Sequence, residues 1–217
     1  MGKTKKEPPK YTFGEELFNS ISHGVGVLVG ISALVLLIIF SCIKGSGYSL
    51  AAGIVYGVSL ITLYSMSMVY HIVQGEKAKA VMRIFDHCSI FVLIAGTYTP
   101  YLLVSLDKTL GWVMFGIIWG MAVIGIILNA IDLEKFKKIS MVCYIIMGWA
   151  IIFTFKPILE AVALPGVMLL LLGGVIYTAG IFFYVSKKHK YMHSVWHLFV
   201  LGGSICHYLS ILLYVVL

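Results

Sequence analysis

Two histidines near the end of the chain have a spacing that suits metal binding. His193 and His197 are four residues apart in the stretch MHSVWHLFVLGGSICHYLSILLYVVL. On a helix, residues at this spacing lie on one face, with their side chains about 6 Å apart. Two imidazoles placed in this way bind one ion on the helices of zinc enzymes. Such a pair alone is more often structural than metal-binding. A metal site is therefore expected only if other residues supply further ligands.

Three residues from two other apolar stretches are candidates to complete a site. A catalytic zinc ion typically has three protein ligands and one open position, and His71 is the natural third ligand. Asp86 would either bind the metal or act as base toward a water on it. Ser67, one turn before His71, would orient that histidine or a substrate oxygen. Alternatively, Ser67 bonds to its own backbone, and Asp86 is stabilised by the dipole at a helix N-terminus.

The remaining polar residues in apolar stretches have weaker assignments. Glu16, Asn19 and His23 either form a second shell around the metal or mark where a surface helix enters the membrane. His87 is expected to cap its helix or to pair with a neighbouring residue, and it is grouped with the same second shell. His207 lies ten residues beyond the second of the paired histidines, about 15 Å further along a helix. It is therefore expected to be a hydrogen-bonded core histidine, in preference to a proton relay or a ligand contact.

The elements that must position these residues are membrane-spanning helices. The 217 residues are 60% hydrophobic and only 12% charged, about half the charged fraction of a soluble domain. A helix needs roughly 20 apolar residues to cross a bilayer. Seven stretches qualify, at about 20–43, 48–72, 85–106, 110–131, 139–156, 162–185 and 193–217. The sequence predicts an all-α, polytopic seven-helix bundle over residues 20–217, preceded by a basic head and a short amphipathic segment over residues 1–19.

The distribution of basic residues predicts the orientation. The head and alternate connections hold thirteen of the 16 Lys and Arg residues, and the other connections hold one each. Cytoplasmic loops carry the excess of positive charge, so the N-terminus is expected in the cytoplasm and the C-terminus outside. This topology accounts for the net charge of +7, so no nucleic-acid partner is expected. Membrane lipids are the expected partners, the plasma membrane is the expected location, and the polar, basic head gives no sign of a cleavable signal. The sequence leaves the oligomeric state open.

Several motifs resemble the hemolysin III family, the bacterial branch of the progestin and adipoQ receptor family. They are SHG in the first span, SMVYH closing the second, DHCSIFVLIAGTYTP in the third and HSVWHLFVLGGSICHY in the seventh. The resemblance covers nearly the whole chain. It implies a seven-helix bundle with a zinc ion near the cytoplasmic face, bound by His71, His193 and His197. It further implies that Asp86 contacts a water on the zinc, and it matches Ser67 to a family serine.

Three functions are compatible with these features. The family's resemblance to alkaline ceramidases favours a zinc-dependent hydrolase acting on a lipid amide or ester, which would enter sideways between helices. The second possibility is a sensor or regulator of membrane lipid state, in which a structural zinc ties the second and seventh helices together. The third is a pore-forming cytolysin, as the family name suggests. It ranks last because the short connections offer no amphipathic insertion segment.

Overall fold

The computed structural model describes residues 11–186 and 188–217, and all of their regular structure is helical. The α-helices are α1 (Phe13–Lys44), α2 (Gly47–Ile72), α3 (Glu76–Pro100), α4 (Lys108–Gly148), α5 (Phe155–Ala161), α6 (Leu164–Val185) and α7 (Met192–Ile211). Short π-helical turns follow α3 (Tyr101–Ser105) and α7 (Leu212–Val216), and a 3₁₀ turn (Ala150–Thr154) joins α4 to α5. The predicted all-α class is confirmed. The basic head up to residue 10 lies outside the described residues.

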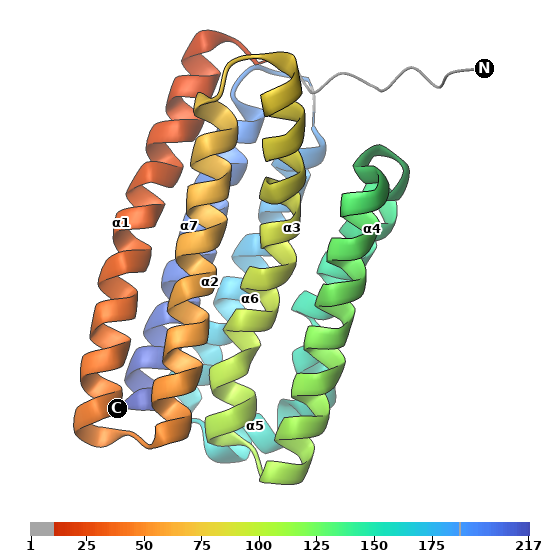
Figure 1. Cartoon of the computed structure of the whole chain (residues 1–217). Coiled ribbons are helices and arrows are strands. Elements are labelled where there is room, and N and C mark those ends of the chain that lie inside the picture. The colour runs from red at the N-terminus through yellow and green to blue at the C-terminus, as the bar shows by residue number, and fades with distance from the viewer. Residues whose placement is uncertain (1–10, 187) are drawn as a thin grey trace.

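Among the described residues, six helical segments are long and apolar enough to cross a membrane, and one of them is bent. The segment Lys108–Ala161 has 54 residues, which as one straight helix would be about 80 Å long. At Asp132 the backbone leaves the helical region, with φ −161° and ψ 92°. Figure 1 shows the chain reversing there, so that the two arms of the segment run side by side. The spans expected at 110–131 and 139–156 fall in these two arms. That the chain crosses the membrane seven times stays a prediction.

The outer surface of the bundle is far more apolar than that of a soluble protein. Large apolar side chains cover the outside, and Leu28, Ile131 and Phe182 are each about two-thirds exposed or more. By contrast, Asn19 and Asn129 are completely buried. Apolar side chains face outward at no cost only where the surroundings are lipid, and polar groups then gather inside, where they find partners. The chain is therefore a multi-pass membrane protein.

Close packing of α1 on α2 brings the polar start of α1 to the candidate histidines. A Cβ at Gly26 would lie 2.3 Å from the Tyr64 ring, and one at Gly57 would lie 2.7 Å from Leu34. Glycine at both positions lets the two helix backbones approach each other. Figure 1 shows the start of α1, the end of α2 and the start of α7 at one end of the bundle. The candidate site lies at that end.

Candidate metal centre

Three imidazoles from two helices converge at this end of the bundle. His71 ends α2, and His193 and His197 lie in the first two turns of α7. One ring nitrogen of each lies within 4.8 Å of the others, and the Nε2 atoms of His193 and His197 are 3.1 Å apart. At Zn–N bonds of about 2.0–2.1 Å, tetrahedral ligand atoms are about 3.3 Å apart. The three histidines could therefore hold a metal ion.

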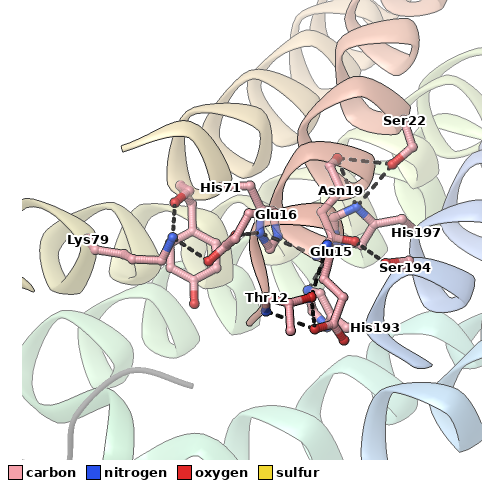
Figure 2. A network of polar contacts seen from close by, with 11 residues as sticks. Thr12, Glu15, Glu16, Asn19, Ser22, His71, Lys79, His193, Ser194 and His197 are labelled. Carbon is pink, nitrogen blue, oxygen red and sulfur yellow. Dashed lines mark hydrogen bonds and ion pairs between the residues drawn. The ribbon is translucent and has the colours of Figure 1, made fainter. Parts of the chain in front are cut away.

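A carboxylate fixes the tautomer of His71 so that its free nitrogen faces the group. The Nδ1 atom of His71 is 2.6 Å from Glu16 Oε2, as Figure 2 shows. Because an ionised carboxylate only accepts hydrogen bonds, Nδ1 carries the proton and Nε2 presents a lone pair. That Nε2 atom is buried and has no hydrogen-bond partner among the described residues. A buried lone pair without a donor is costly, and a cation bound to it would remove that cost.

A backbone carbonyl fixes the tautomer of His197 in the same way. Its Nδ1 atom donates to the carbonyl oxygen of Asn19 at 3.3 Å, and the Ser22 hydroxyl lies 3.4 Å away. The lone pair of Nε2 is again left for the metal. The Asn19 side chain accepts a 2.6 Å hydrogen bond from Ser194. This bond joins α1 to the first turn of α7 and so restrains the helix that carries both paired histidines.

One face of α1 packs against the group of three imidazoles. Glu16, Asn19 and His23 recur at helical spacing on this face, and each contacts a histidine of the group or a residue beside it. The His23 ring stacks on His197 with centroids 3.6 Å apart and planes 15° apart, and its edge meets Tyr64. Both ring nitrogens of His23 are buried without a partner among the described residues. The structure thus places Glu16, Asn19 and His23 beside the three histidines, and their role around a metal ion stays a prediction.

Two residues that the sequence analysis did not single out support the site. Lys79 Nζ lies 2.6 Å from Glu16 Oε1 and donates to the Tyr70 carbonyl at 3.3 Å. Glu16 thus bridges a lysine and an imidazole with its two oxygens. Tyr11 stacks on the His193 ring with centroids 5.0 Å apart. Burial raises the pKa of the Tyr11 hydroxyl, so the phenol is neutral at physiological pH.

The start of α1 is tied to the start of α7. Thr12 caps α1 in a reciprocal pair with Glu15. The other carboxylate oxygen of Glu15 accepts a 2.8 Å hydrogen bond from the Tyr191 backbone N–H. Tyr191 has φ 63°, an uncommon conformation for a residue other than glycine. The capping pattern T-x-x-E was readable in the sequence, but the bond to α7 depends on the fold.

Asp86 and Ser67 lie beside the three histidines and not among them. Asp86 is on α3, its side chain is 13% exposed, and its carboxylate lies 3.4 Å from His87 Nδ1 and near Ser67 on α2. The carboxylate also interacts electrostatically with His71. Among the described residues, the group that could hold a metal ion consists of the three histidines and does not include Asp86.

The two other predicted histidines have hydrogen-bond partners of their own. His87 pairs locally, with Nδ1 donating to the Arg83 carbonyl at 2.9 Å and Nε2 3.3 Å from the Tyr184 hydroxyl. Its Nδ1 atom is also 3.4 Å from the Asp86 carboxylate. His207 donates from Nε2 to the Leu170 carbonyl at 3.0 Å and is buried away from the metal position.

An apolar cavity of about 150 Å³ lies next to the centre. It is enclosed by α3, the second arm of α4, α6 and α7, with side chains such as Leu93, Ile94, Leu171, Ile181 and Val200 on its wall. Tyr184 and Trp196 belong to this wall, and the Tyr184 ring lies 6.0 Å from the His193 ring. Ile145 and Thr178 line the cavity and are exposed on the lipid-facing surface. The cavity therefore extends from the wall residues beside His193 toward the lipid.

A family model and two bacterial relatives all point to haemolysin III proteins. A family model described as "Haemolysin-III related" matches residues 11–208. The chain is 44% identical over 201 residues to "Hemolysin-3" of Bacillus cereus, which covers 93% of this chain and 92% of that protein. It is 42% identical over 206 residues to "Hemolysin-3 homolog" of Bacillus subtilis, covering 95% and 97%. It is 32% identical over 168 residues to "Monocyte to macrophage differentiation factor" of Homo sapiens, covering 72% and 67%.

Proposed function

The chain belongs to the haemolysin III family, and we propose that it is a zinc-dependent hydrolase of a lipid amide or ester. The observation that carries the proposal is the buried, unpartnered Nε2 atom of His71, which faces two further imidazoles. Three neutral nitrogen ligands with room for a fourth group are typical of catalytic zinc. A structural zinc usually has four protein ligands.

The chain's own residues support this chemistry. Glu16 and the Asn19 carbonyl hold two imidazoles as Nδ1–H tautomers, so each offers Nε2 to the metal. When bound, zinc would polarise a carbonyl and lower the pKa of a water at its open position. Asp86, which lies near Ser67 and the histidines, would accept the proton of the attacking water. A C–O bond to the carbonyl carbon forms, the bond to the leaving amine or alcohol breaks, and that group takes the proton.

The surroundings favour a lipid substrate. The apolar cavity runs from the wall beside His193 to the lipid-facing surface between the second arm of α4 and α6. An acyl chain in this cavity would bring its carbonyl end to the wall of Tyr184 and Trp196, next to His193. We place the protein in the plasma membrane with its N-terminus in the cytoplasm, because the Lys and Arg residues gather on alternate connections. A reporter enzyme fused after Leu217 and active only outside the cytoplasm tests this orientation, and activity confined to the cytoplasm contradicts it.

The test of the hydrolase is turnover by the purified full chain in detergent or vesicles. We expect the protein to hydrolyse at least one member of a panel of ceramides, acyl amides and acyl esters. Asp86→Ala should lower the turnover at least 100-fold, as loss of a general base does, while its zinc content stays near that of the unchanged protein.

The same measurement separates the two main readings. The unchanged protein could bind zinc and yet hydrolyse no substrate faster than Asp86→Ala does. That result would favour a regulator in which the metal ties α2 to α7. Equal turnover by both proteins would exclude Asp86 as the base.

A further inference from the structure

The end of the cavity farther from the metal centre carries two polar side chains on facing helices. Tyr177 on α6 and His207 on α7 both line the cavity, and their rings lie 5.4 Å apart. Each ring packs on a glycine of the opposite helix. A Cβ at Gly173 would lie 2.3 Å from His207, and one at Gly203 would lie 2.7 Å from Tyr177. This reciprocal packing fixes both rings in place.

His207 presents an acceptor to the cavity. Its Nε2 atom is 3.0 Å from the Leu170 carbonyl, which can only accept, so Nε2 carries the proton. In the neutral ring Nδ1 is then a lone pair. The edge of the ring with Cδ2 and Nε2 lies against Gly173, so Nδ1 lies on the opposite edge. No donor from the described residues reaches Nδ1, and this atom is not among the completely buried ones.

Tyr177 presents a donor. The Tyr64 hydroxyl donates to Ser204 Oγ at 2.7 Å, and Ser204 Oγ is 2.6 Å from the Tyr177 hydroxyl. Either hydroxyl of the Ser204–Tyr177 contact can be the donor. When Ser204 accepts from Tyr64 and donates to Tyr177, the proton of Tyr177 has no acceptor among the described residues and is free for a ligand. Hydrogen bonds in such a chain strengthen one another, which makes the terminal hydroxyl a good donor.

We propose that Tyr177 and His207 bind a hydroxyl group in the middle of the lipid chain. A hydroxyl both donates and accepts, so it can satisfy the His207 lone pair and the Tyr177 proton together. A carbonyl or ether oxygen only accepts and would leave His207 without a partner. This inference rests on the proposed lipid function and narrows it to hydroxylated acyl chains.

The helix sets where on the chain the hydroxyl lies. His207 is ten residues beyond His197, about 15 Å along α7. With the carbonyl group at the histidines, an extended chain therefore reaches the pair with a carbon near its middle. A hydroxyl beside the carbonyl would lie at the metal centre instead and would not reach Tyr177.

The experiment measures binding of fatty acids, the acyl products of the proposed reaction, by displacement of a fluorescent fatty acid from the purified full chain. Two isomers of hydroxystearic acid are compared, one with its hydroxyl near the middle of the chain and one with it beside the carboxyl. We expect the mid-chain isomer to bind about tenfold more tightly, the worth of one or two hydrogen bonds in an apolar site. Tyr177→Phe should abolish the preference.

Tyr98→Phe is the matched control. Tyr98 also lines the cavity, but its hydroxyl donates to the Gly148 carbonyl and accepts from the Ile151 N–H. The preference should therefore survive this change. Equal binding of the two isomers, or a preference that persists in Tyr177→Phe, overturns the hydroxyl site and leaves the lipid function intact. If neither these acids nor unsubstituted stearic acid displaces the probe, the cavity does not bind fatty acids. That result overturns both the hydroxyl site and the proposal that a lipid occupies the cavity.

Discussion

At the scale of single residues, the carboxylate of Glu16 has the widest influence on the centre. One oxygen lies 2.6 Å from His71 Nδ1 and the other 2.6 Å from Lys79 Nζ. The carboxylate sets the tautomer and the orientation of the imidazole, and the lysine holds the carboxylate. The neighbouring α1 residues act on His197 in a comparable way through the Asn19 carbonyl.

Replacing Glu16 should therefore weaken metal binding without removing a ligand. We expect Glu16→Gln to lower the affinity for zinc by about 10- to 100-fold, because an amide holds His71 less firmly and leaves Lys79 without its ion pair. Competition with a zinc chelator measures the change. Glu160→Gln is the control, since the Glu160 side chain is 66% exposed on α5. An affinity equal to that of the control would show that Glu16 does not orient the ligand.

The sequence identified most of these residues by type and spacing, but not all of their partners. Glu16, Asn19 and His23 share a helical face, so their role could be stated as one of two alternatives. Lys79 was counted only as one of the basic residues that set the topology. Its pairing with Glu16 depends on how closely the start of α3 approaches α1, and no local pattern encodes that distance.

At the scale of helices, the approach of α1 to α2 decides whether the second shell reaches the histidines. Gly26 lies against the face of Tyr64. An added methyl group there has no space, so the helices would separate or the tyrosine would turn. Tyr64 also holds Ser204 through its hydroxyl, which means that the disturbance would spread to α7.

A pair of glycine substitutions tests this packing. Gly26→Ala should lower the midpoint of thermal unfolding by several degrees and reduce the zinc content, because overpacking costs about 1–3 kcal/mol. Gly120→Ala is the control. A Cβ there meets nothing within 4 Å, and alanine in a helix is favoured by about 1 kcal/mol over glycine. A Gly26→Ala protein as stable as the control would mean that α1 does not pack on α2 as described.

The apolar stretches of the sequence predicted where the helices lie, but they predicted the ends of the helices less accurately. The third span was expected from residue 85, whereas α3 begins at Glu76. Its first turns contain Lys, Glu and Ala residues, which are good helix formers but are not apolar, so hydropathy alone missed them. At its other end, α3 stops at Pro100 and a π-helical turn follows it.

At the scale of the whole molecule, the centre combines helices that are far apart in the sequence. His71 and His193 belong to the second and last helices, and the residues that orient them belong to the first. Spacing supplied the pair on α7, His71 was expected as the third ligand, and the family resemblance, now confirmed, implied the same three residues. A buried cluster of imidazoles in a lipid-facing bundle is expensive unless it binds something. A bound cation is the partner that we propose.

The most direct test is the zinc content of the purified full chain, measured by elemental mass spectrometry. We predict about one zinc ion per chain, almost none after His193→Ala combined with His197→Ala, and full content in His189→Ala, since His189 is exposed. Size-exclusion chromatography establishes that each variant is folded. A folded double variant that keeps its full zinc content, or an unchanged protein that binds no zinc, would contradict the metal centre.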